Sequence, residues 1–211
     1  MLSLTANTPK PLLEHNGKSI LQWNLENMPR EISEVIFVIG YLGREIRYFV
    51  QNSILNKKIT FIEQKELNGT GGALALCKDK LGDKFLIING DDLYNAGDLS
   101  RLMAHKLAIL GHWSRDWPGS SLLVDQDQNL IGIESNPPPQ EEKIACSGAY
   151  LLDKRFFNYP LATIKNGKEF SIPHTLITMS RDHKIFVEKA TFWKQINKPE
   201  DLSSAGGTPN N

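Results

Sequence analysis

The chain has 211 residues, 40% of them hydrophobic and 23% charged, a composition typical of one globular domain with a sizeable core. Its 24 basic and 24 acidic side chains give a formal net charge of zero, which argues against a nucleic-acid coat protein and an electrostatic membrane binder. Cys77 and Cys146 form neither a disulfide framework nor a CxxC motif. Without a bilayer-spanning apolar run or a signal peptide, we expect a cytoplasmic protein.

The first part of the chain alternates strand and helix patterns. A β-branched apolar run at 34–40 predicts a strand buried on both faces, and the apolar spacing at 43–56 predicts a helix. A short strand is expected at 59–62, and a glycine cluster at 68–72 then opens a helix. This order predicts βαβ units and a mostly parallel sheet.

The pattern becomes less regular after the next expected strand, at 85–88. Asp98 is a candidate N-cap for a helix that runs through Leu110. Residues 1–202 are expected to form the domain, and 203–211, low in apolar content, a disordered tail. Further strands are predicted near 121–124, 130–134, 145–152 and 184–188, and a helix at 172–181.

Three polar clusters directly follow predicted strands: Gly40-Tyr41, Glu63-Gln64 and 89–92. The ligand crevice of a doubly wound sheet lies beyond the carboxyl ends of its strands, so this coincidence predicts a site there. The glycine loop at 69–72 offers backbone N–H groups to an anion or a nucleobase. It has neither Walker A nor GxGxxG spacing, and a tight strand-to-helix turn explains it at least as well.

Charged residues in two segments, one of them the polar cluster at 89–92, suit a nucleotide and its metal ion. Asp91 and Asp92 repel each other, and a divalent cation such as Mg²⁺ removes that repulsion; capping of the next helix or turn is an equally favoured interpretation. Lys10 stands between Pro9 and Pro11, which hold the local backbone and present the ammonium in a fixed direction suited to phosphate. On that pattern alone, a surface lysine remains the simpler interpretation.

Taken in order, segments of the chain resemble the nucleotidyltransferase family that makes NDP-sugars from an NTP and a sugar 1-phosphate. They include NGTGGAL at 68–74, NGD at 89–91 and EFSIP at 169–173. The glucose-1-phosphate thymidylyl or uridylyl branch and the mannose-1-phosphate guanylyl branch are the most similar. The resemblance extends over nearly the whole chain, with further matching segments at 4–13, 17–21, 38–43, 63–67, 147–152 and 193–202.

The resemblance implies an α/β fold, a Rossmann-like three-layer α/β/α sandwich with a mixed, mostly parallel sheet. It also implies Mg²⁺-dependent transfer, in which the sugar phosphate attacks the α-phosphorus of the NTP and pyrophosphate leaves. By this analogy the catalytic residues are Lys10, which holds phosphate oxygens, and Asp91, which binds Mg²⁺. The remaining assignments are Gln64, Gly69 and Thr70 to the nucleotide and Glu134, Gly148 and Glu169 to the sugar.

The sequence departs from the family at its amino terminus. Members begin with a central strand and a glycine-rich loop that carries an arginine, whereas residues 1–5 here match the stretch that follows them. We therefore expect the first central strand to be missing, which leaves backbone groups unpaired in the middle of the sheet. We also expect Met1 to be an internal methionine of a longer protein. An in-frame stop codon directly upstream would reject that expectation.

A second departure concerns the metal site. Gln195 occupies the position of the family's second metal-binding aspartate, and Asn197 lies two residues further on. Asn197 is the preferred ligand and Gln195 the reserve; either amide lacks a charge, so weak metal binding is expected. The loop after Glu134 also lacks the usual Glu-Lys-Pro sequence, which leaves Lys143 as a distant substitute for the sugar-phosphate lysine.

Three functions stay open at this point. The first is an NDP-sugar pyrophosphorylase, competent once its amino terminus is restored. The second is a non-catalytic module that binds a nucleotide or a sugar phosphate, and the third is a cytidylyl or phosphocholine-type transferase with the same fold. The presence of both Lys10 and Asp91 favours the first. No nucleic-acid or membrane partner is expected, while the nucleobase, the sugar and the oligomeric state are not readable from the sequence.

Overall fold

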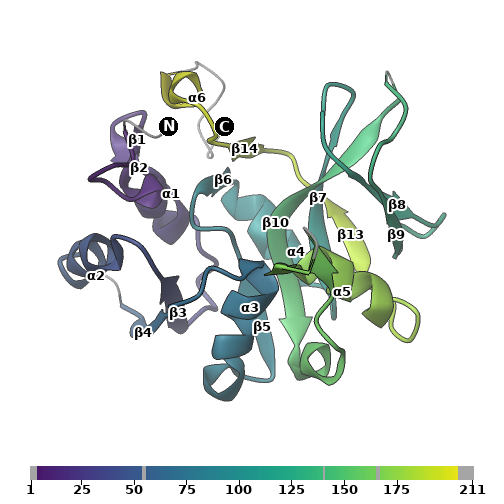
Figure 1. Ribbon diagram of the computed structural model, residues 1–211, viewed down its shortest axis with the longest axis horizontal. Coiled ribbons are helices and arrows are strands. Elements are labelled where there is room, and N and C mark those ends of the chain that lie inside the picture. Colours follow the sequence, from purple (N-terminus) through teal and green to yellow (C-terminus); the bar gives the residue numbers. More distant parts are fainter. Residues whose placement is uncertain (1–3, 54–55, 140, 165–166, 204–211) are drawn as a thin grey trace.

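The computed structural model describes residues 4–53, 56–139, 141–164 and 167–203 (Figure 1). No helix within these ranges is both long enough and apolar enough to cross a membrane. The helices are α1 (Ile20–Glu26), α2 (Gly43–Gln51), α3 (Gly69–Leu76), α4 (Ala96–Met103), α5 (Ile172–Met179) and α6 (Pro199–Ser203). The strands are β1 (Glu14–His15), β2 (Lys18–Ser19), β3 (Glu34–Ile39), β4 (Lys58–Glu63), β5 (Lys84–Ile87), β6 (Asp92–Tyr94), β7 (Ala108–Ser114), β8 (Ser121–Val124), β9 (Leu130–Glu134), β10 (Lys143–Asp153), β11 (Thr163–Ile164), β12 (Glu169–Phe170), β13 (Phe186–Lys189) and β14 (Trp193–Gln195).

A mixed four-stranded sheet with the order β13-β7-β10-β5 forms the centre of the molecule (Figure 1). β13 runs parallel to β7, whereas β10 runs antiparallel to both of its neighbours. β3 and β4 form a separate parallel pair. The remaining described strands make two-stranded antiparallel pairs, of which β6 with β14 and β8 with β9 matter for the site.

Helices cover both faces of the four-stranded sheet. Successive side chains of a strand point to opposite faces, so β10 contributes to two separate cores. Its Leu152 packs in one core with Leu74 of α3 and Leu176 of α5. The preceding residue, Leu151, packs in the other core with Leu99 of α4. Each fully buried leucine stabilises the fold by about 1.5–3 kcal/mol relative to an exposed one. The expected α/β sandwich with a mixed sheet is confirmed, but the four-stranded sheet is not mostly parallel as predicted, because β10 runs antiparallel to both neighbours.

The sheet is interrupted between β3 and β5, which belong to different hydrogen-bonded sheets among the described residues. A cavity of about 750 Å³ lies between residues 34–38 of β3 and residues 84–88 at β5. The apolar side chains of β3 are half-buried rather than buried on both faces as predicted, because no strand of the described residues pairs with this edge. The interruption lies between the β3–β4 pair and the four-stranded sheet.

The predicted helix over 98–110 is wrong in both its start and its end. α4 begins earlier because the side chain of Asn95 accepts hydrogen bonds from Gly97 N and Asp98 N at 2.8 and 3.2 Å. The Asp98 carboxylate is buried and instead accepts from Thr191 N and Phe192 N at 2.8 and 3.0 Å. The apolar residues that follow form β7, because a strand between β13 and β10 buries both of its faces.

Most other predicted elements are present with shifted ends. The strands at 34–40, 59–62, 85–88, 121–124, 130–134, 145–152 and 184–188 correspond to β3, β4, β5, β8, β9, β10 and β13. α2 ends at Gln51, earlier than expected, and α1 was not predicted. Ser203, placed in the predicted tail, is the last residue of α6, and residues 204–211 lie outside the described ranges.

Candidate active site

Lys10 and Asp91 form an ion pair at the carboxyl ends of β3 and β5. Lys10 opens a 3₁₀ turn after Pro9, and its Nζ donates to Asp91 Oδ2 at 2.7 Å. Their side chains are 23% and 40% exposed, so both charges remain accessible to a ligand. The fold thus joins the lysine and the carboxylate that the resemblance assigned to catalysis, although 81 residues separate them in sequence.

The neighbouring carboxylate, Asp92, is turned inward. Its side chain is buried, and its Oδ2 accepts from Asn89 Nδ2 and Trp193 Nε1, each at 3.4 Å. Burial, together with the nearby charge of Asp91, raises the pKa of Asp92 to about 7. Of the two adjacent aspartates, Asp91 therefore presents the accessible carboxylate, while Asp92 helps to anchor the turn.

Gly148 of β10 holds this turn in place from the other side. Its backbone oxygen accepts from Asn89 N at 3.1 Å, at the irregularity of β10 between Cys146 and Tyr150. Gly148 has a φ of +77°, and an added Cβ would lie 2.1 Å from Asn89 Nδ2. Both the left-handed backbone and the close approach require glycine here. The residue that the resemblance assigned to the sugar is therefore directly beside the Asp91 turn.

The glycine loop that opens α3 packs against β12. Phe170 N donates to Asn68 O at 2.7 Å, just before the loop. Gly69 has a φ of +90°, and a Cβ there would lie 2.4 Å from Phe170 O and 3.2 Å from the Cβ of Glu169. The loop is therefore shaped by close packing, and it brings Gly69 next to Glu169, another residue assigned to the sugar.

Gln64, at the end of β4, contacts the same loop. Its Nε2 donates to Asn68 Oδ1 at 2.9 Å and to Gly69 O at 3.3 Å. Thr70 accepts a hydrogen bond from Ile172 N at 3.4 Å through its Oγ1. The structure thus brings together the three residues assigned to the nucleotide. Thr70 and Asp91 also line one cavity, so the glycine loop and the aspartate turn face a common space.

The segment after β3 completes this end of the molecule. Tyr41 donates its hydroxyl hydrogen to Ala6 O at 3.0 Å, which ties this segment to the amino-terminal residues. Pro9, Gly40 and Gly90 line a smaller cavity of about 180 Å³. The clusters at 40–41 and 89–92 therefore lie beside the Lys10 turn, and Gln64 of the third cluster lies next to Gly40.

Amide groups from the carboxyl-terminal part of the chain lie next to the aspartate turn. β14 pairs with β6 so that Gln195 lies opposite Asp92. Asn197 Nδ2 donates to Gln195 Oε1 at 2.6 Å. Among the described residues, no group of three or more His, Cys, Asp or Glu side chains could hold a metal ion. One accessible carboxylate with amide oxygens nearby fits Mg²⁺, which binds through one or two carboxylates together with substrate phosphates and water.

The family model described as "Nucleotidyl transferase" matches residues 1–109, just over half of the 211 residues. The chain belongs to this family. It is 28% identical over 205 residues to the "Bifunctional protein GlmU" of Methanocaldococcus jannaschii. The aligned region covers 96% of this chain and 49% of that protein. This chain spans about half the length of that curated relative.

Two further similarities are informative for this nucleotidyl transferase family member. A Campylobacter jejuni D-glycero-alpha-D-manno-heptose 1-phosphate guanylyltransferase is 26% identical over 159 residues, with 74% of this chain and 72% of that protein covered. A crystal structure of a putative glucose-1-phosphate thymidylyltransferase from Bacillus anthracis superposes with a TM-score of 0.79 at 18% identity, covering 96% of this chain and 87% of that one. The structural similarity supports the fold.

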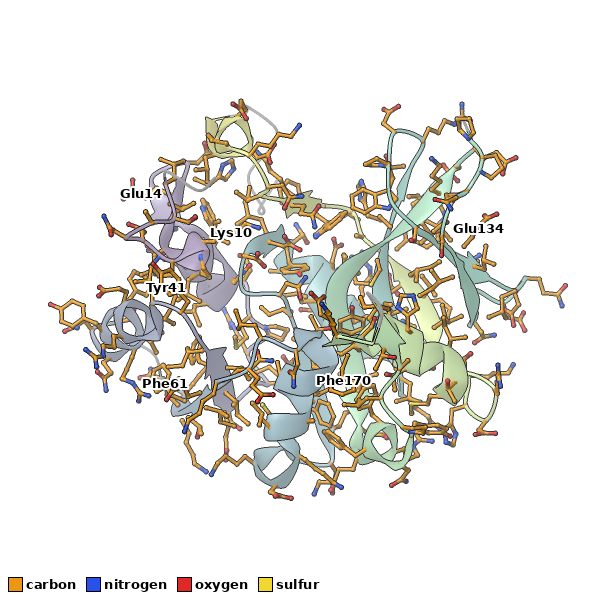
Figure 2. All side chains as sticks on the ribbon, in the orientation of Figure 1. Lys10, Glu14, Tyr41, Phe61, Glu134 and Phe170 are labelled. Atoms are coloured by element: carbon orange, nitrogen blue, oxygen red, sulfur yellow. The ribbon has the colours of Figure 1, made fainter. Side chains whose placement is uncertain are left out.

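Of the two residues considered for the sugar or its phosphate, one lies apart from the Lys10–Asp91 pair and the other is already hydrogen-bonded elsewhere. Glu134 is exposed at the end of β9, and Figure 2 shows it across the molecule from Lys10. Lys143 is buried, and its Nζ donates to Trp117 O at 3.0 Å. In the described contacts, neither residue joins the Lys10–Asp91 pair.

Trp193 and Asn89 are structural partners of the site to which sequence reasoning gave no role there. The indole Nε1 of Trp193 donates to Asp92 Oδ2, and its ring makes an edge contact with Trp117 at a centroid distance of 5.4 Å. Asn89 bonds to Asp92 and Gly148 and so orients the turn before Asp91. The available signal was the position of Asn89 directly after an apolar strand, in the motif NGD.

Proposed function

We propose that this chain catalyses the formation of an NDP-sugar and pyrophosphate from an NTP and a sugar 1-phosphate. The observation that supports this most directly is the accessible Lys10–Asp91 pair, at 2.7 Å, beside the turn after β5. A lysine and a carboxylate at the carboxyl ends of strands combine a phosphate-binding cation with a ligand for a divalent metal. Family membership supports the reaction class, and the geometry supports the choice of these residues.

The reaction itself is a substitution at phosphorus. A phosphate oxygen of the sugar 1-phosphate bonds to the α-phosphorus, the bond from that phosphorus to the bridging oxygen breaks, and pyrophosphate leaves with the electron pair. Lys10 would hold phosphate oxygens as negative charge shifts toward the leaving group. Asp91, with Asn197 or Gln195, would hold Mg²⁺, which when bound neutralises phosphate charge. Positioning the two substrates supplies much of the rate increase.

The remaining residues of the site would select the substrates. Gln64 and the loop at Gly69 and Thr70 would bind the nucleobase, because the amide of Gln64 offers both a donor and an acceptor. Its donor is engaged with Asn68 and Gly69 in the structure, so base binding would exchange those partners. Gly148 and Glu169 would line the sugar, with Glu134 as a more distant candidate.

A non-catalytic module that binds nucleotide or sugar phosphate is the second candidate. The observation in its favour is that Gln195 and Asn197 bond to each other and carry no charge, so Asp91 is the single accessible carboxylate of the proposed metal site. Loss of a second carboxylate weakens metal binding and leaves phosphate binding through Lys10 intact.

A substrate panel tests the two candidates. Pyrophosphate release is measured for ATP, CTP, GTP, UTP and dTTP, each with glucose 1-phosphate or mannose 1-phosphate in Mg²⁺, and NTP binding is measured calorimetrically alongside. We expect release with at least one pair, and its loss on addition of EDTA. Binding of an NTP without release from any pair would favour the module. Release with CTP and phosphocholine, but with neither sugar phosphate, would assign the chain to the phosphocholine-type transferases.

A further inference from the structure

Asp98 belongs to α4, but its carboxylate bonds to the carboxyl-terminal part of the chain. Its Oδ2 accepts from Thr191 N and Phe192 N at 2.8 and 3.0 Å, and its Oδ1 accepts from Thr191 Oγ1 at 2.7 Å. Asp98 is 0% exposed, so solvent does not compete for these bonds. Hydrogen bonds to an ionised acceptor are stronger than those between neutral groups. Asp98 therefore fixes residues 191–192.

Arg101 balances the buried charge of Asp98. Its Nη2 donates to Asp98 Oδ1 at 2.5 Å and to Lys189 O at 3.2 Å, and its Nε donates to Glu188 Oε1 at 3.0 Å. A buried carboxylate without such a partner is strongly destabilising. Asp98 thus accepts from four donors in all, which a carboxylate can do with its two oxygens. An asparagine would keep one acceptor oxygen and turn an NH₂ group toward donors.

The residues that Asp98 fixes lead directly into β14, which begins at Trp193. β14 pairs with β6 so that Gln195 lies opposite Asp92, and Asn197 is bonded to Gln195 (Figure 1). β6 in turn begins directly after Asp91. The position of β14 against β6 therefore sets where the two amides lie relative to the accessible carboxylate.

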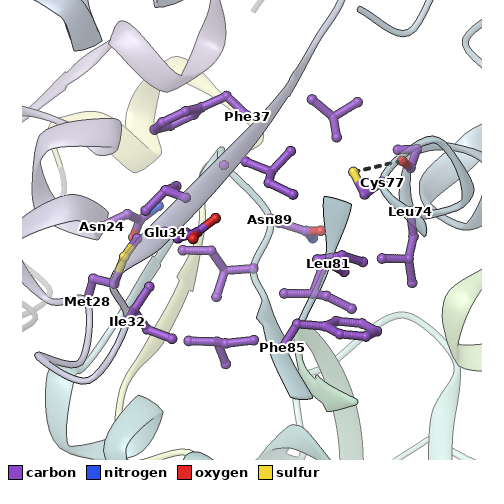
Figure 3. A pocket seen from close by; sticks show the side chains of 18 of the residues that line it. Asn24, Met28, Ile32, Glu34, Phe37, Leu74, Cys77, Leu81, Phe85 and Asn89 are labelled. Atoms are coloured by element: carbon purple, nitrogen blue, oxygen red, sulfur yellow. Dashed lines mark hydrogen bonds between the residues drawn. The ribbon is translucent and has the colours of Figure 1, made fainter. Parts of the chain in front are cut away.

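β6 has anchors of its own, whereas β14 depends on β6 and on the residues before it. The buried amides of Asn24 and Asn27 in and after α1 donate to Asp92 O and Tyr94 O at 2.8 and 2.9 Å. Asn24 also lines the cavity beside β3 (Figure 3). In the described sheets β14 pairs with β6 alone, and an isolated two-stranded pair is marginally stable. The bonds from Asp98 supply a further anchor at the start of β14.

We propose that Asp98 is a positioning residue, which holds the start of β14 so that Gln195 and Asn197 stay beside Asp91. The inference rests on the proposed function, because the amides act as ligands only if Asp91 holds Mg²⁺. In the described hydrogen bonds Asp98 joins neither Asp91 nor either amide, so it acts through residues 191–192. Releasing these residues would lower the fraction of molecules with every ligand in place, and the apparent metal affinity falls by that fraction.

Two variants of Thr191 test the proposal with little risk to folding, since Thr191 is exposed and its hydroxyl bonds to Asp98. Thr191→Val removes that hydrogen bond, whereas Thr191→Ser keeps the hydroxyl. Mn²⁺ is the probe, and its binding to the whole chain without nucleotide is followed by electron paramagnetic resonance. We expect Thr191→Val to bind Mn²⁺ about three- to tenfold more weakly, as loss of one hydrogen bond implies, and Thr191→Ser to bind it as the unchanged chain does.

Asp98→Asn is the stronger variant, and at least about a tenfold loss of Mn²⁺ affinity is expected because several bonds are disturbed. Asp153→Asn is the matched control, since Asp153 also accepts from an arginine, Arg155, but at the end of β10. It should leave Mn²⁺ binding unchanged. Hydrogen exchange, which needs no metal, gives a second readout: exchange at 193–197 should be faster in Asp98→Asn and Thr191→Val and unchanged in the β8–β9 hairpin.

Four results would overturn the proposal. The first is unchanged Mn²⁺ affinity and unchanged exchange in both Asp98→Asn and Thr191→Val. The second is an equal loss of affinity in Asp153→Asn, which would show a general effect of stability. The third is faster exchange at 193–197 with unchanged affinity, which would make the role of Asp98 purely structural. The fourth is an unchanged chain that binds no Mn²⁺.

Failure of the proposed transfer reaction has a different signature. The unchanged chain would bind Mn²⁺, and Asp98→Asn and Thr191→Val would weaken that binding as expected, but no pair of the substrate panel would release pyrophosphate. That outcome would support the positioning role of Asp98 at a metal site and reject the reaction.

Discussion

The strands β7 and β3 have similar apolar sequences but very different surroundings. β7 lies between β13 and β10, and its Ile109 and Leu110 have no exposed surface. β3 pairs with β4 along one edge and borders the cavity along the other, so Val35 and Ile36 stay half-buried. The comparison teaches that the burial of a strand in a layered α/β fold depends on its neighbours at both edges as much as on its own side chains.

The largest expected effect is at the Lys10–Asp91 pair, near the cavity that β3 borders. Asp91→Ala should lower kcat/KM for pyrophosphate release by about 10²- to 10³-fold, because it removes the proposed metal ligand. Stability should change by less than about 1 kcal/mol, since Asp91 is partly exposed and its ion pair is accessible to solvent. Steady-state kinetics and urea unfolding check the two statements. Asp127→Ala, in the turn between β8 and β9, is the control, and activity retained by Asp91→Ala would show that the metal ligand is misassigned.

The contrast between β7 and β3 can be measured with one substitution made in each. Ile109→Ala should lower the free energy of unfolding by about 3–4 kcal/mol, because the site is fully buried and well packed. Ile36→Ala should lower it by about 1–2 kcal/mol, because the side chain is already half-buried beside the cavity. Equal losses in urea unfolding would contradict the difference in packing described here.

Gly148 tests the contact between β10, the neighbour of β7, and the turn that carries Asp91. Gly148→Ala should lower the free energy of unfolding by about 2–3 kcal/mol, because alanine is strained at a φ of +77° and its Cβ would clash with Asn89. The shifted turn should also lower kcat/KM. Gly167→Ala is the matched control, since Gly167 also has a positive φ but nothing within 4 Å of its added Cβ. A loss of stability no greater than that of the control would show that Asn89 simply moves aside.

The smallest effect on stability is expected at the exposed first residues of β3 and β4. Lys58 and Glu34 form an ion pair at 3.1 Å, with side chains 69% and 54% exposed. Lys58→Gln should change the free energy of unfolding by less than about 0.5 kcal/mol, because solvent screens exposed pairs. A larger loss in thermal or urea unfolding would mean that β3 and β4 depend on this pair more than on their apolar contacts.

The elements predicted from the sequence are those with strong local signals. The apolar runs of β3, β4 and β5, and the glycines before α3, identified these elements with end shifts of one or two residues. The region 98–110 failed because its apolar residues fit helical spacing, while the pairing of β7 with β13 and β10 is a long-range interaction. The short pair β6–β14 exists only through contacts between residues about 100 apart, which local periodicity does not report.

The candidate site was predictable in part. The position of polar clusters after strands indicated that the site lies at the carboxyl ends of the strands. The family resemblance then assigned catalytic roles to Lys10 and Asp91. Local sequence did not reveal that Asp92 turns inward or that Asn89 and Gly148 fit against each other, because both depend on β10 passing beside the turn. The separation of Glu134 from Lys10 likewise follows from the β8–β9 hairpin and not from the residues themselves.

The alternation of β10 between two cores has a consequence for how this protein can diverge. Inserting or deleting one residue after Cys146 would exchange the faces of Tyr150, Leu151 and Leu152 and misplace all three at once. Substitutions that preserve side-chain volume can accumulate there, but changes in length cannot. Insertions and deletions in homologous sequences should therefore fall in the connecting loops and leave this strand at constant length, which a count of gaps across an alignment would show.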